Sequence, residues 1–130
     1  MHGISVKTKK GLSLAELLIS VFVLSIGILS VLLFYTNTIT SVQYARDMTM
    51  ATTHGEYIFE EMQTRSSLAN ITATDWVAWG EGAGLNTLPS ESIDVDFVDT
   101  TADPLDITTT INWIRNERAS SISLTTHITK

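Results

Sequence analysis

One apolar run near the N-terminus limits what the chain can fold into: the 18 residues from Leu17 to Phe34 carry no charge. As a helix this run is roughly 27 Å long, close to the ~30 Å hydrocarbon core of a bilayer. Lys7, Lys9 and Lys10 precede it, and basic residues stay on the cytoplasmic side, so we expect the rest of the chain to be exported. The run is longer than a signal-peptide core and lacks a convincing small-x-small cleavage site after it, which favours a retained transmembrane helix.

A helical pattern continues beyond the apolar run. Apolar or small residues recur every three or four positions from Tyr35 to Met62, as on one face of an amphipathic helix. No proline occurs before Pro89. We therefore predict one continuous helix from about Leu12 to about Arg65. The charged residues expected mostly off its apolar face are Arg46, Asp47, Glu56, Glu60 and Glu61.

The C-terminal part has the pattern of a small sheet. Residues 93–97, 107–113 and 122–128 alternate apolar and polar side chains, which is typical of half-buried strands, and residues 115–120 predict a turn between the last two. Such a sheet needs a cover on its apolar face, and the amphipathic half of the long helix can supply one. The predicted fold is α+β: a long N-terminal helix packed against three or four antiparallel strands.

The segment between helix and sheet contains one further expected element. Residues 66–75 (SSLANITATD) predict a polar break. The stretch TDWVAWGEG predicts a short helix that is capped by Thr74 or Asp75 and ended by Gly80. Residues 82–91 predict a loop.

Composition excludes several classes of function. The chain has no cysteine, so neither disulfides nor thiolate metal sites are available. Beyond Gly11 it carries five basic against fourteen acidic residues, a balance that repels phosphate backbones and makes nucleic acid an unlikely partner in general. No P-loop, dinucleotide-binding, zinc-protease or nucleophile-elbow motif is present. We predict a protein that is not an enzyme and needs no cofactor.

The residues ahead of the apolar run form a combined signal. A carboxylate at Glu16 is favoured by the helix dipole, but charged residues in membrane segments usually face a partner. Together, the basic leader, Gly11, the stretch Leu12-Ser13-Leu14-Ala15-Glu16 and the uncharged helix resemble the class III signal of type IV prepilins and type II secretion pseudopilins. Leu12 stands where that family usually has phenylalanine, and Ala15 is smaller than usual, although both are apolar.

The resemblance implies a maturation step and an assembly role. A membrane-bound prepilin peptidase is expected to cut between Gly11 and Leu12 and to methylate the new amine of Leu12. That amine, still cationic, would pair with Glu16 of a staggered neighbour and set the axial register of the bundle. Gly27, in the middle of the run, is a candidate for close helix packing. The expected parts are a removed leader (1–11), a transmembrane half-helix (12–34), an amphipathic half-helix (35–66) and an exported domain (67–130).

Looser features resemble one branch of this family. The stretches LSIGIL, DWVAWGEGAGLNTLPSESIDVDF and ITTTINWIRNERASSISLTTHIT are similar to PilV-like minor pilins and I-type minor pseudopilins. This implies a minor structural subunit of a type IV pilus or type II secretion pseudopilus. Its expected partners are prepilin peptidase, other pilin or pseudopilin subunits, the inner membrane and the inner-membrane assembly platform. Its expected location is the bacterial inner membrane, with the C-terminal domain in the periplasm, and then the filament. The alternatives are a pilus-borne adhesin or DNA receptor, and an unprocessed single-span membrane protein.

Four residues are candidate metal ligands: three aspartates and one histidine. Asp94, Asp96 and Asp99 are weak candidates for calcium, because alternating aspartates on a strand more often form its solvated face. His54 has no second histidine nearby in the long helix, which disfavours a metal site. We therefore predict no metal.

Aromatic and basic residues in the C-terminal part have structural explanations. Trp76, Trp79 and Trp113 are expected in the core or covering the sheet, with an exposed contact patch as the alternative. Arg115 and Arg118 are expected in a solvated turn, and DNA contact is the less favoured alternative.

Overall fold

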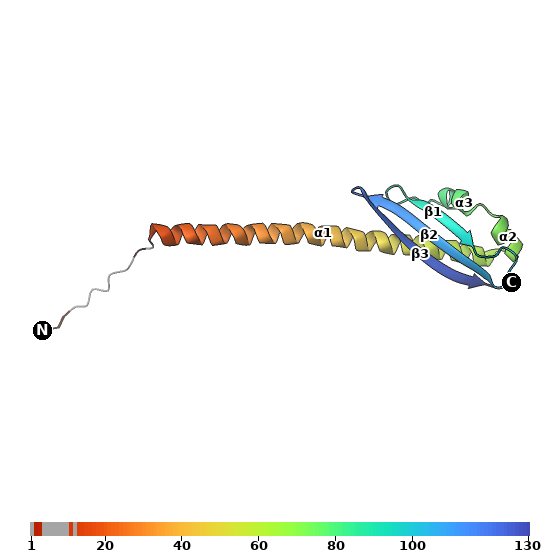
Figure 1. Cartoon of the computed structure of the whole chain (residues 1–130), viewed down its shortest axis with the longest axis horizontal. Helices are drawn as coiled ribbons and strands as arrows, with labels where there is room; N and C mark the ends of the chain where they lie inside the picture. The colour runs from red at the N-terminus through yellow and green to blue at the C-terminus, as the bar shows by residue number, and fades with distance from the viewer. Residues whose placement is uncertain (1, 4–10, 12) are drawn as a thin grey trace. The chain divides into compact units, whose positions relative to one another are not determined.

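The computed structural model describes residues 2–3, 11 and 13–130. These residues form an α+β fold, which confirms the predicted class (Figure 1). The chain divides between Val42 and Gln43 into two compact units. The elements in chain order are α1 (Leu14–Thr64), α2 (Leu68–Ala73), α3 (Trp76–Gly82), β1 (Ser92–Phe97), β2 (Leu105–Arg115) and β3 (Arg118–Ile128).

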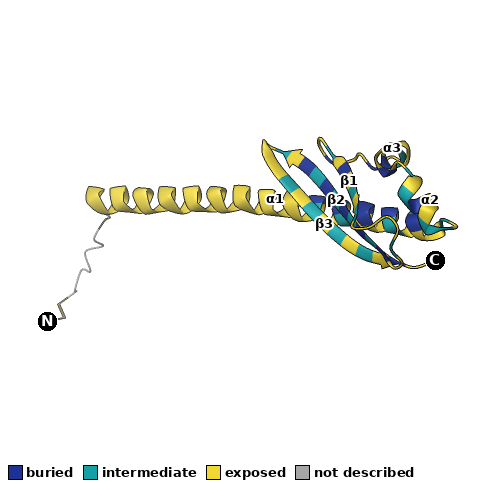
Figure 2. Ribbon diagram, turned by 45° about the vertical axis from the view of Figure 1, so that its right-hand side comes forward, coloured by how far each residue is buried: buried dark blue, intermediate teal, exposed yellow. Residues whose placement is uncertain are grey.

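Helix α1 has two halves with different surroundings, although its backbone is continuous. Its bounds lie within two residues of the predicted ones, since no proline or other strong breaker interrupts the run. Residues 14–46 are exposed on every side, whereas the rest of the helix has one buried face (Figure 2). The buried residues are Asp47, Ala51, His54, Gly55, Ile58 and Met62.

The sheet lies against this buried face of α1. Gly55 allows the approach: a Cβ at this position would lie 2.5 Å from Cδ1 of Leu124 in β3 and 3.6 Å from Cδ1 of Ile111 in β2. Burial of large apolar side chains on both sides of this contact is the main source of stability here. The largest fully buried apolar side chains are Trp113, Ile58, Met62, Ile71, Leu105, Ile107 and Ile111.

The three strands are antiparallel in the order β1-β2-β3. Ile93 pairs with Ile111, and Ile111 pairs with Ile122, so one apolar face runs across all three strands. Asn116 and Glu117 form the two-residue β2–β3 turn with φ of 50° and 63°, the positive values that a tight hairpin of this kind requires. Burial alternates along the strands as predicted. The turn is shorter than the predicted residues 115–120, because Arg115 and Arg118 already pair across the two strands.

The opposite face of the sheet is polar and solvated. Thr108 and Thr125 share a hydrogen bond of 3.2 Å between their hydroxyls, and Thr110 and Ser123 share one of 2.9 Å. Cross-strand hydroxyl pairs of this type stabilise an exposed sheet face modestly. The face therefore needs no cover.

The expected polar break at residues 66–75 is wrong in part, because it contains α2. The Ser67 side chain caps this helix by accepting from the Asn70 amide at 3.3 Å. Ile71 is fully buried, and its carbonyl accepts from Nε1 of Trp76 at 2.8 Å. The buried Ile71, the partly buried Leu68 and the Ser67 cap together stabilise this short helix.

Helix α3 starts as predicted and ends later. Asp75 is its N-cap and accepts from two amides of the first turn, each at 3.1 Å. Gly80 does not end the helix, which continues to Gly82. Gly80 is instead buried, and a Cβ there would lie 2.8 Å from Cδ1 of Ile93. The glycine allows α3 to pack closely against β1.

Candidate assembly segment

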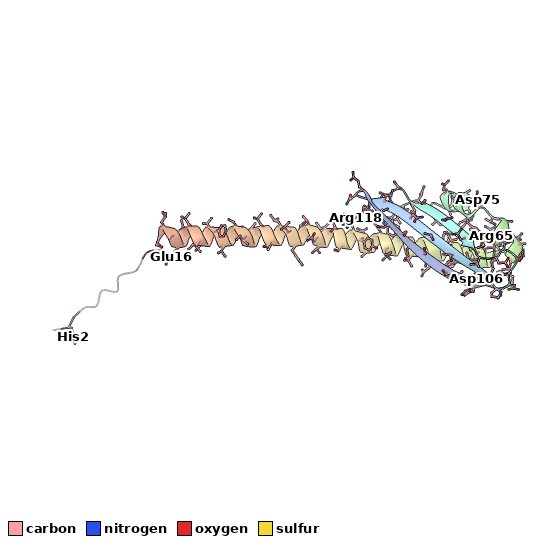
Figure 3. The ribbon with its side chains drawn as sticks, in the orientation of Figure 1. His2, Glu16, Arg65, Asp75, Asp106 and Arg118 are labelled. Carbon is pink, nitrogen blue, oxygen red and sulfur yellow. The ribbon has the colours of Figure 1, made fainter. Side chains whose placement is uncertain are left out.

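The start of α1 is closed by reciprocal hydrogen bonds between Ser13 and Glu16. The Ser13 amide donates to Oε2 of Glu16 at 3.1 Å, and the Glu16 amide donates to Oγ of Ser13 at 3.2 Å. This arrangement is a capping box, which satisfies two backbone donors that the helix itself cannot. Figure 3 labels Glu16 at this end of the helix. The Ser-x-x-Glu spacing is visible in the sequence, but we did not predict the box from it.

The helix that follows is long and apolar enough to cross a membrane. All of its described side chains up to Arg46 are exposed in the single chain. A helix that is apolar all round is normally surrounded by lipid or by other helices. This half of α1 is therefore the largest apolar surface of the described chain that lacks a cover.

Polar side chains within the apolar half are satisfied inside the helix. The hydroxyls of Ser20, Ser25 and Ser30 donate to the carbonyl four residues earlier, at 2.8, 2.7 and 2.8 Å. Bonds of this type let serine lie in an apolar environment without an unpaired donor. Apart from its chain neighbours and the nearby backbone of its own helix, no described atom lies within 4 Å of a Cβ at Gly27, so the space needed for close helix packing is open in the single chain.

The predicted cleavage site lies only partly within the described chain. Gly11 precedes α1 and is exposed. Leu12, the predicted first mature residue and methylation site, lies outside the described residues, as does most of the predicted leader. Glu16 is exposed at the helix start, where its carboxylate is accessible to a neighbouring chain.

Asp47 was placed off the apolar face, and this prediction is wrong. It is buried on α1 and accepts from Nε and Nη2 of Arg115 at 2.5 and 2.9 Å. This two-point ion pair raises the pKa of the Arg115 guanidinium above its ordinary value, so the arginine stays charged. Arg115 is the last residue of β2, and its side chain is held by Asp47 of α1. Arg118, the other candidate for DNA contact, is exposed at the start of β3 (Figure 3).

His54 is also buried on α1, and it joins the helix to the loop before β1. Its Nδ1 lies 2.5 Å from Oε1 of Glu91, whose side chain is 1% exposed. The other oxygen of Glu91 accepts from the Leu88 amide at 2.9 Å, and Nε2 of His54 lies 3.4 Å from the Thr87 hydroxyl. Both hydrogen bonds of the His54 side chain to described residues go to this loop and help to fix it.

The aspartates considered for calcium are not gathered. Asp94 and Asp96 alternate on the solvated face of β1, and Asp99 lies in the turn after it. Both the hydroxyl and the amide of Thr101 donate to Oδ1 of Asp99, at 2.7 and 2.8 Å, and they hold the pKa of this carboxyl below its ordinary value. Across residues 2–3, 11 and 13–130, no group of three acidic, histidine or cysteine side chains is placed to hold a metal.

The tryptophans belong to the fold. Trp76 and Trp113 are buried, which confirms their predicted core position. Trp79 is half-buried, and its ring lies 5.5 Å from that of Trp76 and 5.6 Å from that of Tyr57. The Arg65 guanidinium lies 5.4 Å from the Trp76 ring centroid, a cation–π contact. These rings hold α3 against α1.

The class of protein that these observations define is a small α+β domain joined to a long helix whose first half has an uncovered apolar surface. Comparisons of the chain with protein-family models, with curated proteins and with solved structures find no match.

Proposed function

We propose that this chain is a prepilin-like structural subunit of a type IV pilus or a type II secretion pseudopilus, most like a minor subunit. Prepilin peptidase matures it after Gly11, and it assembles through the first half of α1. The observation that carries the proposal is the combination at one end of the chain: a capped carboxylate at Glu16 followed by a helix that is apolar and uncovered on every side.

The exposed apolar half of α1 needs an apolar environment both before and after assembly. Each Leu, Ile, Val or Phe left in water forgoes about 1.5–3 kcal/mol of burial free energy, so the helix is held by the inner membrane before assembly. In the filament, other subunits' helices replace the lipid. Lys7, Lys9 and Lys10 keep the N-terminus cytoplasmic, which places the sheet in the periplasm.

Glu16 sets the axial register of the helix when other subunits replace the lipid around it. An unpaired carboxylate is strongly unfavourable in an apolar bundle, and the α-amino group of a matured subunit is mostly cationic near neutral pH. Beyond Glu16 the helix carries no charge up to Phe34, so it has many axial positions of similar energy. Pairing Glu16 with the amine of a neighbouring Leu12 selects one of them.

The second unit supplies the surface that a filament would carry outward. Asp47–Arg115 and His54–Glu91 attach the sheet and the loop before β1 to α1. These contacts fix the sheet to the second half of the helix.

A filament-incorporation experiment tests the proposal. The full-length chain is expressed with its assembly system, the cells are sheared, and the fraction of the subunit in the filament pool is compared with that in the membrane pool. Glu16→Ala should leave insertion and cleavage largely intact and deplete the filament pool. Glu60→Ala, which removes an exposed carboxylate from the second half of α1, is the control and should incorporate normally. Normal incorporation of Glu16→Ala would contradict the register argument.

A further inference from the structure

We propose that Thr87, His54 and Glu91 form a hydroxyl–imidazole–carboxylate relay, which makes the Thr87 hydroxyl a nucleophile toward activated carboxylic esters. His54 comes from α1, whereas Thr87 and Glu91 come from the loop before β1. The proposal goes beyond the structural role above and does not depend on it, because all three side chains belong to the second unit and assembly through the first half of α1 makes no use of them.

The relay follows from three contacts. Oγ1 of Thr87 lies 3.4 Å from Nε2 of His54, and Nδ1 of His54 lies 2.5 Å from Oε1 of Glu91. The second oxygen of Glu91, Oε2, accepts from the Leu88 amide at 2.9 Å. A hydroxyl within reach of a base, with the base oriented by a third group, is the general arrangement that activates serine and threonine as nucleophiles.

The carboxylate determines which nitrogen of His54 carries the proton. An ionised Glu91 side chain can only accept hydrogen bonds, so Nδ1 of His54 is the donor. In the neutral imidazole the other nitrogen, Nε2, then keeps its lone pair. Nε2 therefore accepts from the Thr87 hydroxyl, which is the direction that a general base requires.

Burial leaves the nucleophile accessible and protects its base. The side chains of His54 and Glu91 are 8% and 1% exposed, so water competes little for the contact between them. Thr87 itself is exposed, so a small molecule can reach it. The loop is also tied to the sheet, because the Pro89 carbonyl accepts from the Ile114 amide at 2.9 Å. The hydroxyl is thus presented on a loop that is attached to both α1 and β2.

The expected reaction is one acyl transfer to the protein. Oγ1 of Thr87 attacks the carbonyl carbon of the ester, and Nε2 of His54 takes the hydroxyl proton. The tetrahedral adduct then collapses, the bond to the leaving oxygen breaks, and His54 releases its proton to that oxygen or to water. Thr87 keeps the acyl group as an ester. A positioned general base contributes about 10²–10⁴-fold, which suits an ester that has a good leaving group.

The test uses 4-nitrophenyl acetate, added near neutral pH to the folded full-length chain in detergent. Release of nitrophenolate is followed by absorbance, and the acetylated residue is located by tandem mass spectrometry after an acid quench. Thr87→Ala removes the nucleophile, and Thr87→Ser keeps a hydroxyl. Thr53→Ala is the matched control, because Thr53 is exposed on α1 and its hydroxyl donates to the Thr49 carbonyl at 2.9 Å. Near-UV circular dichroism checks that each variant is folded.

The expected result is specific to the relay. Thr87→Ala should lower the release rate about a hundredfold, measured above the background from the exposed His2 and His127, which every variant retains. Thr87→Ser and Thr53→Ala should stay near wild type. In the quenched wild-type chain the acetyl group should be found on Thr87.

Glu91 acts through His54 and is a positioning residue, so its test has a spectroscopic readout. Nitrogen NMR of His54 should show the proton on Nδ1 in the wild type. Glu91→Ala should lose this tautomer preference and release nitrophenolate more slowly. An unchanged tautomer in folded Glu91→Ala would overturn the role of Glu91.

Two outcomes overturn the relay as a whole. One is a Thr87→Ala chain that releases nitrophenolate at the wild-type rate. The other is a wild-type chain without an acetyl group on Thr87. Neither outcome bears on the proposed function, which is tested by cleavage and incorporation.

Discussion

Thr109 gives the sharpest stability prediction. It lies in the middle of β2 and is fully buried. Its cross-strand neighbours on the apolar face, Val95 and Leu124, cannot accept or donate a hydrogen bond. The Thr109 hydroxyl has no hydrogen-bond partner among the described residues. Such a hydroxyl loses its hydrogen bonds to water on folding and forms no hydrogen bond within the protein to replace them.

The magnitude follows from this burial. A buried polar group without a partner costs about 1–3 kcal/mol, and valine replaces the hydroxyl of threonine with a methyl group of similar shape. We use the low end of this cost, because a hydroxyl can rotate toward a more favourable direction, whereas an amide cannot. Thr109→Val should therefore raise the free energy of unfolding by ~1 kcal/mol. For a unit the size of residues 43–130, this corresponds to an increase of about 4–8 °C in Tm.

The assay is thermal and urea unfolding of the full-length chain in detergent, followed by near-UV circular dichroism of the buried tryptophans. Thr110→Val is the matched control, since Thr110 is the next residue on the same strand but faces solvent and bonds Ser123 at 2.9 Å. The control should change Tm little or lower it. If Thr109→Val lowers Tm, the hydroxyl has a partner and the reasoning is wrong.

Two further predictions concern charged groups of the second unit. Arg115→Gln should lower the urea midpoint more than Asp47→Asn, because it leaves a buried carboxylate unpaired, whereas Arg115 is 38% exposed and can regain water; equal effects would contradict this asymmetry. Thr101→Val should raise the pKa of Asp99 toward its ordinary value in an NMR titration, since the Thr101 hydroxyl is the largest cause of the lowered pKa. The lowered pKa favours the folded state above the unfolded pKa and loses this effect as the pH falls through the folded pKa, so an unchanged Asp99 titration would contradict the assignment.

The fold was largely predictable because its signals are local. A long run without proline indicates a helix whatever it packs against, and strict alternation in residues 107–113 and 122–128 indicates strands with one apolar face. The register then follows, since a slip by one residue would turn Ile107 and Ile111 to solvent. The start of α3 was predictable for the same reason, because Asp75 caps its own helix.

The missed features depend on distant partners. Asp47 and His54 look like surface residues in the helical pattern, and they are buried because Arg115 and Glu91 reach them from 68 and 37 residues away in sequence. Gly80 was predicted to end α3, but contact with β1 determines its role instead. At the start of α1, the sequence indicated Gly11 and Glu16 as functional residues. The capping box between Ser13 and Glu16 could also have been predicted from the Ser-x-x-Glu spacing.

The central claim is that this chain is matured as a prepilin, and the mass of its N-terminus tests it most directly. The full-length chain is expressed with a prepilin peptidase that also processes a control prepilin in the same cells. We predict a product that begins at Leu12 and carries one N-methyl group, and a Gly11→Val variant that keeps its leader. A wild-type chain that still begins at Met1, beside a fully processed control, would contradict the account.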